Sequence, residues 1–343
     1  MKVGYFCYRL SGNGPRTRAR DVINAIATRT DHHVVVLTGE PEKVDEAAEI
    51  VPVAVDKPID ALRKVRRHLS DADLVHVPIN VYQAAFVRAA YSGPIVIGVG
   101  PGTQPTHWHG LLGRAIGVDV KITTHRYMTR WKRYGYETPL CAATIDRDEF
   151  YPYDDERVRA LRDSMGIAPE ANVLLYVGRL TEYKGAALVS ELAELLADDE
   201  ETVVIVVGDG PLEEEFEDRD DLRFEGFVDN EKLPDYFNAA DVTLIPRETD
   251  VTCNVGLESI ACGTPAITTA DGVIRLLFED HGTYVWADRD AASVRDAAFE
   301  LLEDEDLYRA QVERGFETLS KMNMSLEDAI RTHSEVYERV ASA

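Results

Sequence analysis

The sequence predicts an α/β protein made of two doubly wound, Rossmann-like domains that face a central cleft. Short apolar runs alternate with helix-like stretches along the whole chain, as expected for parallel sheets covered by helices on both faces. The length of 343 residues is also comfortable for two domains of ordinary size. Because ligands of such sheets bind beyond the carboxyl ends of the strands, we expect the chemistry in the cleft.

The first domain is expected to span residues 1–150. Its strands are predicted where β-branched and aromatic residues cluster, as in "HHVVVLT" and "GPIVIGV". The predicted strands are 2–8, 32–38, 72–78, 93–99 and 119–125, and the predicted helices are 18–28, 59–69 and 82–90.

The second domain is expected to span residues 151–324 and to repeat the same alternation. Its predicted strands are 172–178, 202–208, 222–228, 241–247 and 264–270, and its predicted helices include 185–196, 231–239 and 255–262. A last helix, at about 325–343, is expected to pack back on the first domain.

Composition narrows the class of protein. No run of about 18 apolar residues is present and the N-terminus lacks a signal-peptide core, so we expect a cytoplasmic protein. The four cysteines have neither CxxC nor zinc-ligand spacing, which favours small apolar residues in a reducing compartment. The net charge of −24 repels nucleic acid phosphates. It is also what we expect of a halophilic archaeal protein, since salt screens the self-repulsion.

Glycine-rich turns follow the predicted strands. Gly12 and Gly14 after the first strand allow a ligand to approach the backbone closely, although a plain turn explains them equally well. In "VGRLTEYKG", Arg179 and Lys184 precede a predicted helix, whose N-terminus favours an anion. The "GDG" at 208–210 indicates either a ligand loop or a turn with positive φ.

An acidic pair follows the strand at 241–247. Asp250 and Glu258 are eight residues apart, the first in a loop and the second inside the predicted helix 255–262. The N-terminus of that helix would present free N–H groups to a phosphate. A buried glutamate needs a hydrogen-bond partner, and ribose hydroxyls would supply one.

In combination these motifs resemble the retaining GT-B glycosyltransferases of family four, also called glycosyltransferase group 1. The resemblance rests on "VGRL" with "KG", on "GDGP", on "GFV", on "LPDYFNAADVTLIP" and on the acidic pair with "LESIACGTPAI". It is close over residues 172–269 and looser over the whole chain. It implies that a sugar moves from a nucleoside diphosphate sugar to an acceptor hydroxyl, without a cofactor or metal.

The resemblance also implies roles for single residues. Arg179 and Lys184 would stabilise the charge on the departing diphosphate, and with Asp250 they form the expected catalytic set. Glu258 would bind the ribose hydroxyls. The other expected donor-binding residues are Gly12, Gly14, Phe227, Val228, Thr252, Cys253, Asn254 and Val255.

Two positions depart from the family pattern. Asp250 stands where the family has glutamate, and Gly100 stands where it has a histidine beside the sugar. His107 and His109 follow closely and are assigned, with Arg16, to acceptor binding. A plain polar loop and a metal site are the alternatives for this histidine pair, although no third ligand is visible.

Two other functions are compatible with such a site. A nucleotide-sugar epimerase shares the GT-B fold, but it should carry more acid/base groups around the sugar than this sequence offers. A non-catalytic nucleotide-sugar binding protein would use Arg179, Lys184 and Glu258 for binding alone.

Charge differs between the two halves and suggests an acceptor. Residues 1–150 hold 20 Lys+Arg and 16 Asp+Glu, whereas residues 151–343 hold 17 and 45. Basic clusters lie at 16–20, 63–67 and 126–133, and the last interleaves aromatic residues such as Trp131, as at a lipid headgroup interface. We therefore expect a lipid-linked, polyprenyl-phosphate-type acceptor, with the enzyme peripheral at the inner membrane face and Arg16 near the acceptor phosphate. The alternative is a soluble acceptor.

Overall fold

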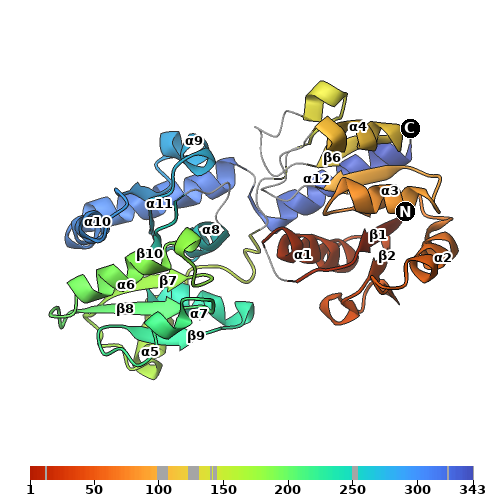
Figure 1. Cartoon of the computed structure of the whole chain (residues 1–343). Coiled ribbons are helices and arrows are strands. Elements are labelled where there is room, and N and C mark those ends of the chain that lie inside the picture. Colours follow the sequence, from red (N-terminus) through yellow and green to blue (C-terminus); the bar gives the residue numbers. More distant parts are fainter. Residues whose placement is uncertain are drawn as a thin grey trace. The chain divides into compact units, whose positions relative to one another are not determined.

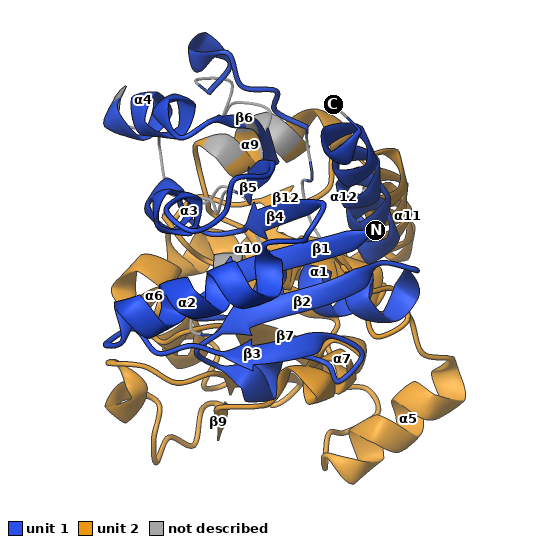
Figure 2. Ribbon diagram, turned by 90° about the vertical axis from the view of Figure 1, so that its right-hand side faces the viewer, with its two compact units in different colours: residues 1–144, 323–343 blue, residues 145–322 orange. Residues whose placement is uncertain are grey.

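Two six-stranded parallel sheets organise the chain (Figure 1). The computed structural model describes residues 1–11, 14–98, 107–122, 131–139, 141, 145–248, 254–322 and 324–342. Its contacts divide the chain into two units (Figure 2). Unit 1 contains residues 1–144 and 323–343, and unit 2 contains residues 145–322.

In unit 1 the strand order is β3-β2-β1-β4-β5-β6, and all pairings are parallel. The strands are β1 (Lys2–Cys7), β2 (His33–Thr38), β3 (Glu49–Pro52), β4 (Leu74–Val77), β5 (Ile95–Gly98) and β6 (Val118–Ile122). The helices are α1 (Gly14–Arg29), α2 (Pro58–Leu69), α3 (Val81–Arg88), α4 (His107–Ala115) and α12 (Leu326–Ala341). From β1 the chain adds β2 and β3 on one side of the sheet, and then β4, β5 and β6 on the other side. The place between β1 and β4 is therefore the switch point at which ligands of such sheets bind.

Both faces of this sheet are buried. Along β1, Val3, Tyr5 and Cys7 belong to one apolar core, and Phe6 belongs to the other. Successive side chains of a strand point to opposite faces, so a strand buried on both sides reads as a continuous apolar run. The motif "VGYFC" is such a run.

The last helix, α12, belongs to unit 1 and packs against α1 and β4. It begins at a capping box, in which the Ser325 hydroxyl accepts from Asp328 N at 3.1 Å and the Asp328 carboxylate accepts from Ser325 N at 3.2 Å. Its buried residues recur at helical spacing and end with Tyr337, which is fully buried. The C-terminal segment is therefore part of the first sheet's core.

In unit 2 the strand order is β12-β11-β10-β7-β8-β9, again parallel throughout. The strands are β7 (Asn172–Val177), β8 (Thr202–Val207), β9 (Arg223–Gly226), β10 (Val242–Ile245), β11 (Ala266–Thr268) and β12 (Val285–Trp286). The α-helices are α5 (Asp155–Ser164), α6 (Ala186–Leu195), α7 (Leu233–Ala239), α8 (Asn254–Ala261), α9 (Val273–Phe278), α10 (Ala291–Glu303) and α11 (Glu305–Lys321). Its switch point lies between β7 and β10.

The two doubly wound parallel sheets confirm the predicted fold class. The ten predicted strands and seven predicted helices are present, with ends that differ by a few residues. The sequence analysis missed β3 and β12, which are edge strands of four and two residues. Such short strands give too little alternation to be recognised.

Candidate functional site in unit 2

The candidate site lies at the carboxyl ends of the strands in unit 2. The loop after β7 carries Arg179 and Lys184, and the loop after β8 carries "GDG" at 208–210. Phe227 follows β9, and α8 follows β10. Because all these strands are parallel, their carboxyl ends share one edge of the sheet, and the predicted donor-binding motifs of unit 2 meet there.

The loop after β7 is held by local hydrogen bonds and by one glycine. The Thr181 hydroxyl accepts from Lys184 N at 3.3 Å and caps the short 3-10 helix Glu182–Lys184. Gly185 then has φ +79°, a left-handed conformation that favours glycine. A Cβ at position 185 would overlap the carbonyl oxygen of Pro246, at the end of β10. The glycine therefore lets the β7 and β10 loops touch at the switch point.

The "GDG" loop packs on the same segment. Leu180 N donates to Asp209 O at 2.7 Å, and Gly178 N donates to Val207 O at 3.0 Å. Gly208 has φ +141°, and a Cβ there would overlap the Gly178 carbonyl oxygen. The two glycine-rich loops are thus locked backbone to backbone, which fixes where residue 179 leaves the sheet.

Arg179 and Lys184 bring positive charge to this edge. The Arg179 side chain is exposed, and the Lys184 side chain is half-buried beside Tyr183, with its Nζ 5.8 Å from that ring's centroid. The Tyr176 hydroxyl donates to Arg179 O at 3.1 Å, so the backbone at the arginine is fixed while its guanidinium faces solvent. Two cations on a rigid loop before a helix N-terminus can bind an anion such as a phosphate.

The α8 side of the site carries the predicted glutamate. Glu258 is half-buried one turn into α8, and Asn254 and Val255 form the first, half-buried turn. Burial raises the pKa of the nearby Cys262 thiol, and the Glu258 carboxylate raises it further. A carboxylate near the switch point can accept hydrogen bonds from hydroxyl groups of a ligand.

Phe227 and Val228 differ in exposure. The Phe227 ring is 70% exposed, whereas Val228 is half-buried. An exposed ring at the carboxyl edge offers an apolar surface on which a planar base can stack.

Several predicted residues lie outside the described residues. They are Gly12, Gly100, Asp250, Thr252 and Cys253. The first turn of α1 begins at Gly14, so this predicted donor-binding glycine lies at a helix N-terminus in unit 1.

One charged residue at the edge was missed by the sequence analysis. Arg247 is 7% exposed and directly follows Pro246, whose carbonyl oxygen faces Gly185. Its backbone carbonyl accepts from the Thr269 hydroxyl at 3.0 Å, which links the β10 end to β11. The signal that could have identified Arg247 from the sequence is a cation directly after a buried strand beside the switch point.

The predicted acceptor residues lie in unit 1. Arg16 is half-buried in α1, and its Nη1 donates to Ser11 O at 3.5 Å. His107 and His109 begin α4, so the expectation of a plain polar loop is wrong. Residues i and i+2 of a helix project about 200° apart, which also disfavours a metal site shared by these two histidines. The His109 ring instead contacts the Tyr82 ring, with centroids 5.2 Å apart.

The predicted membrane-facing role of Trp131 is wrong. Its side chain is 2% exposed and packs in the core of unit 1, with Lys121 Nζ 2.9 Å from the ring centroid. Arg18 of the first basic cluster is also buried, at 8% exposure. A pattern of cations and aromatics does not distinguish a surface from a core, because long side chains can bury either end. Arg126 and Arg130 of the third cluster lie outside the described residues.

Comparison with known proteins finds similar glycosyltransferases. Residues 158–318, most of unit 2, match the family Glycosyl transferases group 1. The chain is 36% identical over 146 residues to a D-inositol 3-phosphate glycosyltransferase of Catenulispora acidiphila, covering 37% of this chain and 33% of the relative. It is 31% identical over 217 residues to a D-inositol 3-phosphate glycosyltransferase of Geodermatophilus obscurus, covering 58% of this chain and 47% of the relative.

Solved structures agree on the fold. A glycosyltransferase from Rickettsia africae superposes with a TM-score of 0.80 at 14% identity, covering 99% of this chain and 98% of that one. Anabaena HepE, solved with UDP and glucose, superposes with a TM-score of 0.75 at 16% identity, covering 98% and 99%. The residues that match glycosyltransferase group 1 therefore lie in a chain with the two-domain fold of GT-B glycosyltransferases. The chain spans about a third to a half of the length of the curated relatives named above.

Proposed function

We propose that the protein is a retaining glycosyltransferase that moves a sugar from a nucleoside diphosphate sugar to an acceptor hydroxyl. The observation that carries the proposal is the pair of cations, Arg179 and Lys184, on a loop locked at the switch point of the glycosyltransferase group 1 domain. The HepE structure, which is a complex with UDP and glucose, supports a nucleotide-sugar donor.

The chemistry follows from charge. In the transfer, the bond between the sugar's anomeric carbon and the diphosphate oxygen breaks, and a bond to the acceptor oxygen forms on the same face. The acceptor's proton passes to the departing phosphate, so no protein base is required. Negative charge develops on the diphosphate as it leaves, and Arg179 and Lys184 would stabilise that charge more than the ground state. Glu258 would hold the ribose hydroxyls, and Asp250 would contact the sugar.

The test is release of diphosphate and transfer of sugar with a panel of nucleotide sugars. Arg179→Ala and Lys184→Ala should each lower turnover by about 10²–10³-fold while leaving the melting temperature unchanged. Arg309→Ala is the matched control, because Arg309 lies on the exposed face of α11 and pairs with Glu305 at 2.8 Å. Wild-type turnover in either site variant would remove that residue from the mechanism.

The same assay separates the other functions. An epimerase would convert the donor sugar without releasing diphosphate. A binding protein would gain thermal stability with a nucleoside diphosphate sugar but release nothing, since any ligand that prefers the folded state raises the melting temperature. Steady diphosphate release that depends on Lys184 supports the transferase.

For the acceptor, we propose a lipid-linked, polyprenyl-phosphate-type carrier, with the protein bound peripherally at the cytoplasmic face of the membrane. No helix of the described residues is long and apolar enough to cross a bilayer. Unit 1 does expose large apolar side chains on two adjacent helices: Tyr82 on α3 is 60% exposed, and Trp108 and Leu111 on α4 are 78% and 54% exposed. The exposed Arg114 lies one turn further along α4. This face replaces the buried Trp131 as the surface that would enter a headgroup layer.

Co-sedimentation with vesicles containing anionic lipids tests this surface. Trp108→Ala with Leu111→Ser should release the protein into the supernatant. Leu195→Ser, which changes an exposed leucine of α6 in unit 2, should leave binding unchanged. Equal binding of the double variant and the wild type, or no vesicle binding by the wild type, would exclude this surface and favour a soluble acceptor.

A further inference from the structure

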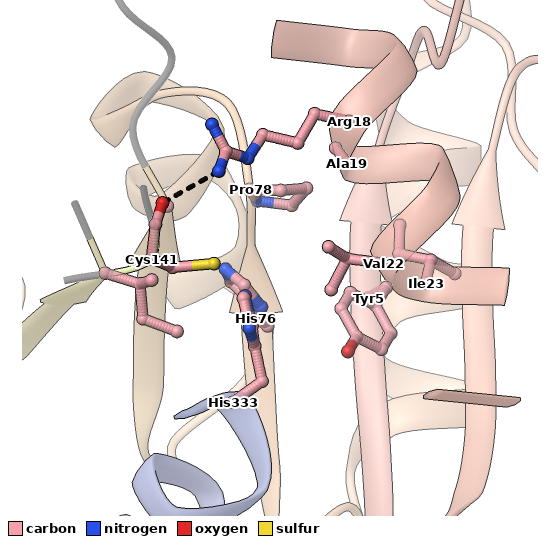
Figure 3. Close-up of a pocket in the computed structure, with 11 residues that line it drawn as sticks. Tyr5, Arg18, Ala19, Val22, Ile23, His76, Pro78, Cys141 and His333 are labelled. Carbon is pink, nitrogen blue, oxygen red and sulfur yellow. Dashed lines mark hydrogen bonds between the residues drawn. The ribbon is translucent and has the colours of Figure 1, made fainter. Parts of the chain in front are cut away.

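A cavity lies inside unit 1, at the switch point of the first sheet (Figure 3). About 40 Å³ of it is open to the centre of a water molecule, whereas one water needs roughly 10–15 Å³. Its lining includes Arg18 of α1, His76 of β4, Gly98 of β5, Cys141 and His333 of α12. Apart from Gly98, each of these residues is buried.

Arg18 brings a buried positive charge to this cavity. Its side chain is 8% exposed, and its Nη2 donates to Cys141 O at 2.8 Å (Figure 3). Within the described residues, no carboxylate oxygen lies within 4.0 Å of its guanidinium. The carboxylate of Asp21, one turn further along α1, is paired with Arg20 at 2.7 Å and acts on the Arg18 charge only from a distance. A buried guanidinium whose hydrogen-bond partner is a carbonyl, with no carboxylate in contact, has a desolvation cost that is only partly offset.

His76 contributes a second donor. Its Nδ1 lies 2.6 Å from the Tyr337 hydroxyl, which lies 2.8 Å from the Tyr5 hydroxyl. Every hydroxyl proton finds an acceptor if Tyr5 donates to Tyr337 and Tyr337 donates to His76 Nδ1. This order places the ring proton on Nε2, which is buried and has no partner among the described residues. Burial holds the pKa of His76 well below its usual value, so the ring stays neutral.

Gly98 lies beside His76 Nε2 and has no side chain to cover it. A Cβ at position 98 would lie 3.2 Å from His76 Nε2, and glycine there is also required by Pro78 O at 2.6 Å. The unpartnered Nε2 therefore lies beside Gly98, and both residues line the cavity together with Arg18.

Neutral and metal occupants fit this lining less well. A cation would be repelled by the Arg18 guanidinium, and no three ligand atoms of His76, His333 and Cys141 come within 4.8 Å of one another. Water can occupy the space, but water does not balance the guanidinium charge.

We propose that this cavity binds a single oxyanion group, a phosphate or a carboxylate, through the Arg18 guanidinium and the His76 Nε2–H. One anion then supplies an acceptor to both buried donors and neutralises the charge. The site is built from residues that the donor assignment does not use. Only its occupation by a phosphorylated acceptor rests on the proposed function; anion binding itself does not.

Calorimetric titration with inorganic phosphate at constant ionic strength tests the site. Because Arg179 and Lys184 would also bind phosphate, the titration is made on the full chain carrying Arg179→Ala and Lys184→Ala. Phosphate should bind saturably in this background, and adding Arg18→Met should weaken binding by about 10–100-fold. Adding Arg20→Met, two residues along the same helix, should change nothing. Absence of saturable binding, or equal binding with Arg18→Met, overturns the proposal.

A second measurement uses the unmodified protein, in case Arg18→Met does not fold. The ¹⁵N resonance of His76 Nε2, assigned with a His76→Gln variant, should shift on addition of phosphate. The resonances of His281, an exposed histidine of unit 2, should not shift. Glycerol phosphate distinguishes the source of the anion: a matching shift indicates the phosphoryl group of a larger substrate, and a shift with inorganic phosphate alone indicates a free anion. A constant Nε2 resonance with both probes means that the cavity holds water only and overturns the proposal.

Discussion

The Tyr337 hydroxyl of α12 lies 2.6 Å from Nδ1 of His76 in β4, 261 positions earlier in the chain, and both side chains are buried. The same hydroxyl lies 2.8 Å from that of Tyr5 in β1. One oxygen atom therefore joins the C-terminal helix to the two strands that flank the switch point of unit 1.

Tyr337→Phe should destabilise the protein although the ring is retained. The change leaves the Tyr5 hydroxyl and His76 Nδ1 buried without their partner, which costs about 1–3 kcal/mol of unfolding free energy. Urea unfolding measures the change. Tyr82→Phe, which removes the hydroxyl of a 60% exposed tyrosine, is the control and should stay within about 0.5 kcal/mol of wild type. A Tyr337→Phe value as small as that of the control would mean that water replaces the lost hydroxyl.

Unfolding free energy should fall with acidification through the buried histidine of α12. Burial is the main cause that lowers the pKa of His333 from 6.5 to about 4; a hydrogen bond to Ala329 O opposes this shift, and the nearby Arg18 charge adds to it. The ring is therefore neutral in the folded state down to about pH 4, whereas the unfolded chain binds a proton near pH 6.5. The contribution of His333 to the unfolding free energy is fully present above pH 6.5. It is lost as the pH falls towards 4, by about 1.4 kcal/mol per pH unit.

The measurement is urea unfolding between pH 4 and 7 at fixed KCl. His333→Gln, which keeps a donor for Ala329 O, should show a slope shallower by about one proton over this range. Comparing slopes rather than absolute stabilities removes any constant effect of the substitution. Identical slopes for the variant and the wild type would show that His333 titrates normally in the folded state.

Gly185→Ala should destabilise the protein and disturb the candidate donor site. The same change at a glycine whose added Cβ would contact no other atom should have a much smaller effect. The alanine would adopt φ +79° and overlap Pro246 O, so the β7 and β10 loops would separate. Gly166→Ala is the matched control, because Gly166 has φ +69° and no atom within 4 Å of the added Cβ. The control should lose roughly 1–2 kcal/mol from backbone strain alone, and Gly185→Ala should lose about 1–3 kcal/mol more.

Donor binding separates the two glycines further. Nucleotide-sugar affinity should fall for Gly185→Ala and stay unchanged for Gly166→Ala, since only the first change moves the segment that carries Arg179 and Lys184. Titration calorimetry on both variants gives the comparison. Equal losses of stability and equal donor affinities would mean that the loop adapts to the added methyl group.

The sequence reveals the fold because two signals repeat through the chain. Continuous apolar strands such as β1 and β8 need both faces covered, and the glycines at 185 and 208 mark places where backbones touch. These signals are local, so they can be recognised from the residues alone. They locate the edge where Arg179, Lys184 and Glu258 meet.

Whether a charged or aromatic side chain is buried depends on residues far away in the sequence, and the predictions for such side chains were wrong. Trp131 follows a run of cations and looks like an interface residue, but the ring fills the core of unit 1 beneath Lys121. Arg18 looks like part of a basic surface, but α12 and Cys141 enclose it through residues more than 100 positions away. The cavity of unit 1 could not be predicted, because its lining comes from four strands, two helices, Pro78 and Cys141.

Melting temperature should rise with KCl. The excess of acidic side chains lies in residues 151–343, which hold 45 Asp+Glu against 17 Lys+Arg. Some of them, such as Glu214 and Glu215 of one 3-10 turn, are exposed next to one another. Raising salt from 0.1 M to 1 M shortens the screening distance from about 10 Å to about 3 Å and weakens this repulsion. Salt also weakens exposed ion pairs such as Arg309 with Glu305, at 2.8 Å, but such pairs contribute only about 0.3–0.5 kcal/mol each.

Relief of repulsion should therefore exceed the loss of ion pairs. The double change Glu214→Gln with Glu215→Gln removes two of the repelling charges, so it should raise the melting temperature in 0.1 M KCl and change it little in 1 M KCl. Removing Glu305, which has a cation beside it, should instead lower the melting temperature in dilute salt. Sucrose at matched osmolality controls for preferential exclusion, which stabilises folded proteins without screening charge. A melting temperature that is flat or falls with KCl, or that rises equally in sucrose, would exclude charge screening as the source of stability and with it the halophilic interpretation.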